Sequence, residues 1–404
     1  MNSKIQNSNT SPSLWLTLGI LALIGVIYFI IEQLNGRFQL VDFEVYYKAA
    51  TRAISGENLY RPEEDGFFRY KYSITAALFF IPLSVLPLFA SKVCYWFLLT
   101  FTMVFGYRLL HTLTARPFQS KIYGPLLLTG ILGLVSTELE LHLGQVNFII
   151  LSLLLGTAYF YKKQKQLSAA LLWAISIFLK PFGLILLPYF IVRKEFKLLG
   201  FFFSLATLLF FLPILFYGWT GLWEQTQLWM QELSIEMSKK QDLLQEANHT
   251  IFSVIARYTP LAYITFSDSI IKIYQLVLLS SLGLIVLFAM RKTKDMEDHI
   301  PYDFAYLIAL IPMLSFTDKN AFLFVLPLIF MLLINFHKLP KLAKFLSVLG
   351  LFLYGGNVRE LWMRIPAPGY DNAALCWDAL SFITIGSLLV WSIFVFFIHR
   401  SSTQ

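Results

Sequence analysis

The chain has 404 residues, of which 57% are hydrophobic and only 14% are charged. A soluble domain does not bury so large an apolar fraction, and apolar runs recur from residue 13 to residue 398. Each run of about 20 residues can cross a hydrocarbon core about 30 Å thick, so we expect an all-α, polytopic integral membrane protein. The alternation typical of a membrane barrel is absent. The formal charge of +8 does not indicate a nucleic-acid partner, because basic residues of membrane proteins gather in cytoplasmic loops.

The first apolar run, LWLTLGILALIGVIYFIIEQL, is too long for the core of a signal peptide, and no small-residue cleavage site follows it. We therefore expect it to remain as a membrane helix. The two cysteines, Cys94 and Cys376, lie in or beside apolar runs without the spacing of a metal site, so we assign them no role.

Four compact basic clusters set the expected topology, and we place them in the cytoplasm: residues 162–165, 193–197, 291–294 and 337–344. The apolar run between the first two clusters carries Leu-Lys-Pro in its middle. It therefore predicts a hairpin of two short helices, with Lys180 at the opposite membrane face or deep in the membrane.

Extending this registration predicts about twelve crossings. The expected spans lie near 13–35, 89–110, 122–137, 145–161, the hairpin, 197–217, 270–290, 302–316, 320–337, 342–357 and 376–398. Segment 73–87 is short and contains Pro82 and Pro87, which favours an interfacial or partly inserted helix. We expect one membrane domain over 1–404, with an N-terminal module at 13–200 and more variable helices at 201–404.

Under this registration both termini are cytoplasmic, and the large loops on the other side of the membrane are 36–72, 218–249 and 358–375. Nearly every unusual polar residue falls on that same side, which suggests a shared site. Loops are polar in general, but this does not account well for Gln145, Asn147 and Lys180 inside or at the edge of apolar helices.

The stretch VDFEVYYKAA, residues 41–50, follows the first span. On a helix, Glu44, Lys48 and Arg52 are four residues apart and predict a ladder of ion pairs. Asp42 has no local basic partner. Two interpretations, which are compatible, are a helix N-cap and a general base beside a cavity floored by Tyr46 and Tyr47.

Three stretches together resemble glycosyltransferase family 87 of the GT-C superfamily: VDFEVYYKAATRAISGENLYRP, FRYKYSITAALFFIPLSVLP and the segment from HLGQVN through FLKPFG. The resemblance is strongest over residues 40–195. It implies an inverting transfer of a sugar, with mannose favoured, from a polyprenyl-phosphate donor to a hydroxyl acceptor on the extracytoplasmic side of the cell membrane. Asp42 matches the family's first-loop aspartate and would be the catalytic base.

A lipid-phosphate leaving group needs positive charge nearby, and Lys180 is the candidate for it. The alternatives for Lys180 are snorkelling to the interface or pairing with Glu138 or Glu140. His142, Gln145 and Asn147 stand at a helix start, where amides and side chains could hold phosphate or sugar hydroxyls. Helix–helix hydrogen bonding is the alternative for Gln145 and Asn147.

The remaining candidate residues are assigned from the same resemblance. Asn248 and His249 would contact sugar or phosphate, although Asn248 could instead cap a helix. Tyr46 and Tyr72 are further donor contacts, with a place in the aromatic belt as the alternative for Tyr72. In LSFTDKNAF, Asp318 and Lys319 replace the aromatic and imidazole side chains expected of the family. The possible acceptor or sugar contacts are Asp318, Lys319, Asn320 and Glu44.

The expected partners are membrane lipid, a polyprenyl-phosphate-linked sugar and a glycolipid or glycan acceptor, without nucleic acid or a cofactor. No Gly-rich phosphate loop, nucleotide fingerprint or external Asp-x-Asp pair is present, which disfavours a nucleotide-sugar donor held by a metal. We assign no metal ligands, and metal dependence stays open. The rival functions are a lipid or lipid-linked-sugar flippase, for which only FLKPFG resembles a broken helix, and a noncatalytic lipid-binding subunit.

Overall fold

The computed structural model describes residues 12–114, 123–238, 243, 248–263, 267–294, 296, 298–316 and 318–401. Apart from one isolated bridge between Ala367 and Tyr370, these residues form helices and the connections between them. The expected all-α class is therefore confirmed for the described part of the chain.

Four straight helical segments are long and apolar enough to cross a membrane. They are α1 (Pro12–Leu34), α6 (Leu88–Thr114), α15 (Asp268–Thr293) and the continuous run of η4 (Lys319–Val325), α18 (Leu326–Asn335) and η5 (Phe336–Lys338).

Three further pairs pass the same test but are bent, which gives up to seven spans if each pair is one crossing. They are α7 (Tyr123–Leu132) with α8 (Leu134–Leu143) at 57°, α12 (Phe196–Phe211) with α13 (Ile214–Ser238) at 90°, and α21 (Ala373–Ala379) with α22 (Phe382–Ser401) at 54°. Seven is fewer than the twelve crossings expected, and that larger number stays a prediction.

The remaining helices are shorter. Those of the apolar body are α9 (Asn147–Lys162), α10 (Gln166–Leu179), η2 (Pro181–Leu186), α11 (Leu187–Val192), α16 (Ile300–Ile308), α17 (Leu310–Leu314) and α19 (Lys341–Gly355). The peripheral ones are α2 (Val41–Ile54), α3 (Pro62–Asp65), η1 (Gly66–Phe68), α4 (Ile74–Phe79), α5 (Ile81–Ser84), α14 (Ile251–Tyr258), η3 (Pro260–Tyr263) and α20 (Arg359–Trp362).

The surface of α15 illustrates why the molecule belongs in a bilayer. This helix exposes Ile273 (62%), Leu276 (64%) and Leu284 (68%). A soluble monomer rarely leaves so continuous an apolar surface in water, whereas acyl chains cover it at no cost. The structure is therefore that of a multi-pass membrane protein.

The predicted helical hairpin is present. Helix α10 ends at Leu179, and Lys180 takes an extended conformation, with φ −149° and ψ 143°. The cause is Pro181, whose ring disfavours the helical conformation of the residue before it. The indole of Trp173 then donates to Gly183 O at 2.7 Å and holds the returning segment against α10.

The predicted loop 218–249 is wrong over its first part, because α13 continues to Ser238. The chain breaks at Gly218, where φ is +65°, and then resumes a helix. Residues 219–238 contain too many Gln and Glu side chains to be recognised as a membrane span from the sequence. Polar and apolar residues nevertheless alternate along them with a helical spacing. Residues 239–242 and 244–247 lie outside the described part.

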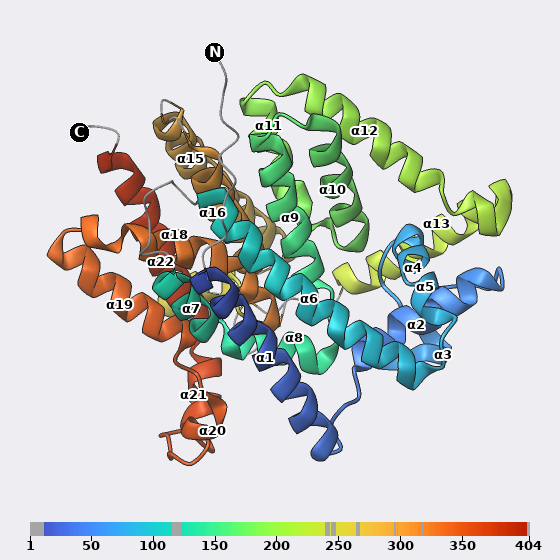
Figure 1. The fold of residues 1–404 in the computed structure, drawn as a ribbon, viewed down its shortest axis with the longest axis horizontal. Coiled ribbons are helices and arrows are strands. Elements are labelled where there is room, and N and C mark those ends of the chain that lie inside the picture. The colour runs from blue at the N-terminus through green and yellow to red at the C-terminus, as the bar shows by residue number, and fades with distance from the viewer. Residues whose placement is uncertain are drawn as a thin grey trace.

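At the right of Figure 1, α13 returns toward the short helices α2 and α4 and contacts both. Two ion pairs fix this arrangement, since Arg69 lies 2.5 Å from Glu232 and 2.5 Å from Glu236. Segment 73–87 forms α4 and α5, two helices too short to span a bilayer.

Helix α9 lies inside the body and packs against α6, α10 and η4. One region is consequently formed by four element ends: the end of α8, the start of α9, the end of α10 and the start of η4. Polar side chains in this region come from segments far apart in sequence.

Candidate active site

A chain of three hydrogen-bonded side chains lies where α2, α9 and the α10 end meet. Gln145 Nε2 donates to Asp42 Oδ2 at 2.5 Å. On the other side of the same amide, Lys180 Nζ donates to Gln145 Oε1 at 2.7 Å. One glutamine therefore connects the predicted base to the predicted phosphate-binding lysine.

A close approach of two backbones creates this chain. Gly144 ends α8 with φ +70°, and a Cβ added there would lie 3.1 Å from both Leu40 and Phe43. The turn before Gln145 is thus packed directly on the start of α2. Tyr95 Oη also donates to Gln145 O at 3.0 Å, which fixes the backbone of the bridging residue.

Asp42 is not the N-cap of α2. Leu40 occupies that position with left-handed backbone angles, and Asp42 lies inside the first turn. Among the described residues no basic side chain forms an ion pair with Asp42. Burial raises the pKa of its carboxyl, while the Gln145 hydrogen bond and the charge of Lys180 oppose that rise.

Glu140 organises the opposite side of the site. Its Oε2 accepts from Asn147 Nδ2 at 2.8 Å and from Asn320 Nδ2 at 2.9 Å, and its Oε1 accepts from the Asn147 and Phe148 amides at 2.5 Å and 3.2 Å. These are the free amides of the α9 N-terminus. This buried carboxylate caps the Asn147 and Phe148 amides, so these two amides are not free for a substrate phosphate. The expected role of the side chains at this helix start stays a prediction.

Lys180 contacts amide oxygens rather than a carboxylate. Besides Gln145, its Nζ donates to Asn147 Oδ1 at 3.0 Å. Its charge interacts with Glu140 through Asn147 instead of by direct contact. A cavity of about 260 Å³ adjoins these groups, and its lining includes Gln145, Asn147, Lys180, Asp318 and Asn320.

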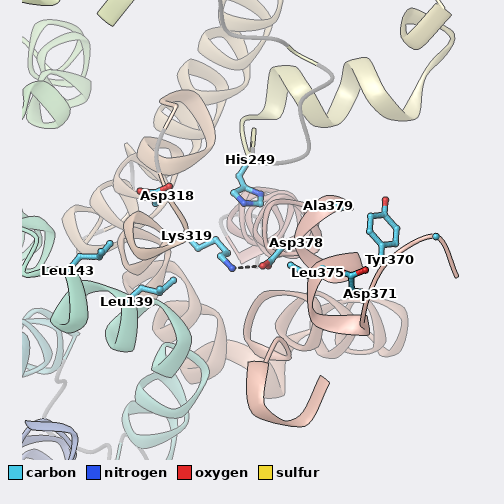
Figure 2. Close-up of a pocket in the computed structure, with 11 residues that line it drawn as sticks. Leu139, Leu143, His249, Asp318, Lys319, Tyr370, Asp371, Leu375, Asp378 and Ala379 are labelled. Carbon is cyan, nitrogen blue, oxygen red and sulfur yellow. Dashed lines mark hydrogen bonds and ion pairs between the residues drawn. The ribbon is translucent and has the colours of Figure 1, made fainter. Parts of the chain in front are cut away.

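A second cavity, of about 550 Å³, lies on the other side of Asp318 and is shown in Figure 2. Its polar lining consists of His249, Asp318, Lys319, Tyr370, Asp371 and Asp378. Lys319 Nζ donates to Asp378 Oδ2 at 2.5 Å, and this pair lies below the His249 ring in the view of Figure 2.

Asp318 belongs to the lining of both cavities. Its side chain is exposed, and no hydrogen bond or ion pair joins it to another described side chain. The structure therefore places a solvated carboxylate between the two spaces.

Several predicted site residues lie outside both cavities. Glu44 pairs with Lys92 at 2.5 Å and Arg52 pairs with Asp65 at 2.5 Å, so the predicted ladder through Lys48 is wrong. His142 Nδ1 lies 2.6 Å from a Glu32 carboxylate oxygen.

Asn248 is fully buried, and its Oδ1 accepts from the Thr250 amide at 3.1 Å. The predicted cap at Asn248 is wrong, because the Thr250 side chain caps α14 by accepting from Ser253 N. Asn248 consequently supports the turn that presents His249.

The predicted tyrosines surround the glutamine bridge instead of flooring a cavity. Tyr46 is buried, and its Oη lies 3.0 Å from Tyr72 Oη and 3.3 Å from Gln145 Oε1. The Tyr72 ring lies 5.8 Å from Lys180 Nζ, a cation–π distance. Tyr47 donates to Leu86 O at 2.9 Å and lines neither cavity.

Sequence reasoning missed Tyr370, Asp371 and Asp378. They lie in the predicted external loop 358–375 or just after it, but nothing in their spacing relates them to residues 318 and 319. Among the residues that the structure describes, no three His, Cys, Asp or Glu side chains are grouped closely enough to hold a metal ion.

Comparison with known protein families decides the identity of the fold. The model of glycosyltransferase family 87 matches residues 70–317, more than half of the chain. The chain belongs to glycosyltransferase family 87. The family 87 protein is therefore a membrane glycosyltransferase of the GT-C type, an enzyme that works with a lipid-linked sugar donor and an acceptor. No curated protein sequence matches it.

The family match covers only part of the candidate site of this family 87 enzyme. It includes Gln145, Asn147, Lys180 and His249 and extends well beyond residues 40–195, where the resemblance is strongest. It begins after Asp42 and ends one residue before Asp318. The family match therefore does not test the roles expected of those two carboxylates.

Proposed function

We propose that this enzyme transfers a hexose, with mannose favoured, from a polyprenyl-phosphate sugar to a hydroxyl acceptor on the extracytoplasmic side, with inversion at the anomeric carbon. Asp42 is the general base, and Lys180 stabilises the phosphate that leaves. The observation that carries this proposal is the hydrogen-bonded chain from Asp42 through Gln145 to Lys180. Gln145 and Lys180 line the smaller cavity, and Asp42 lies one hydrogen bond behind that lining.

The step is a single displacement. Asp42 takes the proton of the acceptor hydroxyl while the hydroxyl oxygen forms a bond to the anomeric carbon. The bond from that carbon to the phosphate oxygen breaks, and the electron pair leaves with the polyprenyl phosphate. An attack from the face opposite to the leaving group inverts the configuration.

The electrostatics of the two ends suit these roles. A carboxylate with a pKa raised by burial is a stronger base toward a hydroxyl than a fully solvated aspartate. At the other end, Lys180 donates to two neutral amide oxygens, and among the described residues no carboxylate forms an ion pair with it that would compete with an incoming phosphate. Gln145 sets the spacing between them.

The first test replaces Asp42 with asparagine, which keeps the shape of the side chain and removes the base. Purified enzyme in lipid discs is given polyprenyl-phosphate hexoses and a hexoside acceptor, and transfer is followed by mass spectrometry. We expect Asp42→Asn to lower kcat by about 10²- to 10⁴-fold, the contribution typical of a general base, with donor affinity little changed. Equal transfer by both proteins would remove Asp42 from the mechanism.

The second test concerns the lysine. Lys180→Met keeps the length of the side chain and removes the charge, so we expect about tenfold or greater loss of affinity for the polyprenyl-phosphate donor. Lys294→Met, at the exposed C-cap of α15, is the matched control and should bind the donor as the wild type does. Unchanged affinity of Lys180→Met would contradict the phosphate role.

A further inference from the structure

The larger cavity has the size of a small-molecule site and a charge that selects among ligands. Its volume of about 550 Å³ lies within the range typical of such sites. The lining contains three carboxylates, those of Asp318, Asp371 and Asp378, and one ammonium group, that of Lys319. The formal charge of the lining is −2, opposite in sign to what a phosphate or carboxylate ligand needs.

The carboxylates are not equivalent. Both oxygens of Asp378 are occupied, one by Lys319 at 2.5 Å and the other by Asn357 Nδ2 at 2.7 Å. The side chains of Asp318 and Asp371 are exposed and have no hydrogen bond or ion pair with another described side chain. They are therefore free to accept hydrogen bonds from ligand hydroxyls.

His249 supplies an independent indication of a ligand. Only 6% of the surface of this residue is exposed, yet the His249 side chain lines the cavity (Figure 2). Its Nδ1 lies 3.0 Å from Ser381 Oγ, and within the described structure no group hydrogen-bonds to the other ring nitrogen, Nε2. Since the ring lines the cavity, this unpartnered nitrogen is open to water or a ligand there.

The tautomer of His249 follows from its surroundings. Arg257 Nη2 donates to Ser381 Oγ at 2.5 Å, so the hydroxyl proton of Ser381 is directed elsewhere. The nearer acceptor is His249 Nδ1 at 3.0 Å, compared with Asn248 O at 3.5 Å. Nε2 therefore carries a hydrogen toward the cavity. Burial lowers the pKa of His249 to about 4, which keeps the ring neutral near pH 7.

We propose that this cavity is the acceptor subsite and that it selects an uncharged hexosyl headgroup over an anionic one. His249 Nε2 donates to one ligand hydroxyl oxygen, and Asp318 and Asp371 accept from other hydroxyls. The hydrocarbon face of the sugar packs on Tyr370. The proposal rests on the transfer function above, because Asp318 also borders the cavity in which the donor phosphate would meet Lys180.

The experiment measures acceptor binding without any donor, so that its outcome is independent of catalysis. Full-length protein in neutral lipid discs is titrated with octyl mannopyranoside and octyl glucopyranoside, and with octyl glucuronoside as the anionic counterpart. Each titration is corrected for partition into discs without protein. We expect the neutral glycosides to bind at least about fivefold more tightly than the glucuronoside.

Charge removal tests the source of that preference. Asp318→Asn and Asp371→Asn should each reduce the discrimination about threefold, because each removes one of the repelling carboxylates. Glu63→Gln removes an exposed carboxylate of α3 that lines neither cavity, and it should leave the discrimination unchanged. Equal loss in all three variants would overturn the proposal.

Variants at His249 test the hydrogen bond. His249→Phe should weaken neutral-glycoside binding about tenfold, and His249→Gln, which restores an N–H donor, should recover part of the loss. Lipid-linked donor binding should stay unchanged in both, and thermal unfolding verifies that both are folded. The aspartate variants provide the test if either His249 variant fails to fold.

Two results would overturn the acceptor subsite. One is glucuronoside binding as tight as that of the neutral glycosides. The other is the absence of glycoside binding in protein that still turns over the polyprenyl-phosphate donor. If the wild-type protein binds the glycosides normally but transfers no sugar from the polyprenyl-phosphate donor, the proposed catalytic function would be contradicted instead.

Discussion

At the scale of single residues, the bridging amide of Gln145 is the most informative contact. Its two ends have different roles, because Nε2 can only donate and Oε1 can only accept. The donor end stabilises the charged form of Asp42, and the acceptor end holds the ammonium group of Lys180. Neither end could be exchanged for the other without breaking both contacts.

A pH profile follows from this arrangement. Burial raises the pKa of Asp42 and the Gln145 hydrogen bond lowers it, so Gln145→Met should raise it further. Since the base works as a carboxylate, the acid limb of kcat/KM should move to higher pH, by about one unit for a bond worth about 1.4 kcal/mol.

The control for this profile is Tyr46→Phe. It removes a hydroxyl near Gln145 Oε1 that makes no hydrogen bond to Asp42, so the acid limb should stay in place. An acid limb that does not move in Gln145→Met would show that the amide does not tune the base.

At the scale of elements, the turn between α8 and α9 determines whether the site forms. Gly144 has a positive φ, and its hydrogen atoms lie against Leu40 and Phe43 at the start of α2. A side chain here would strain the turn and push α2 away, which would separate Asp42 from Gln145.

Gly144→Ala and Gly36→Ala form a matched pair. Both glycines have a positive φ, of +70° and +64°, but nothing lies within 4 Å of a Cβ added at Gly36. We expect Gly36→Ala to cost about 1 kcal/mol from backbone strain alone. Gly144→Ala should cost about 1–3 kcal/mol more and should also lower kcat. Thermal unfolding and transfer assays measure the two effects, and equal loss in both variants would contradict the packing role.

The sequence predicted elements better than contacts. The hairpin at Lys180 was predictable because a proline after a lysine in an apolar run has a strong local effect on the backbone. The ladder predicted from Glu44 was wrong because Glu44 pairs with Lys92, 48 residues further along the chain, instead of with Lys48 on its own helix. The capping of α9 by Glu140 was missed for a similar reason. The spacing of residues along the chain does not reveal that the turn after α8 brings Glu140 to the start of α9.

The candidate site was predicted in part for physical reasons of the same kind. Lys180, Gln145 and Asn147 were conspicuous because polar side chains are costly in apolar helices. Asp371 lies in an ordinary polar loop and Asp378 just after it, so only their convergence with Lys319 distinguishes them. The extent of α13 was missed because its composition is too polar for a hydropathy criterion.

At the scale of the whole molecule, the expected topology is open to direct measurement. We replace Cys94 and Cys376 with serine, since both are free thiols, and introduce either Lys163→Cys or Gln231→Cys, two exposed positions. If residues 162–165 are cytoplasmic, a membrane-impermeant maleimide added to intact cells should label position 231 and not position 163. Labelling of both positions from the same side would overturn the registration.

The right angle between α12 and α13 has a consequence for where the chemistry takes place. If α12 runs along the bilayer normal, α13 is parallel to the plane of the lipids, with Trp219 and Trp223 exposed at headgroup depth. The ion pairs of Arg69 with α13 then hold the first loop at that same level. Ser73, in the segment that follows this loop, donates to Phe178 O at 2.7 Å, just before Lys180, so a lipid phosphate at headgroup depth would approach that lysine from its own leaflet.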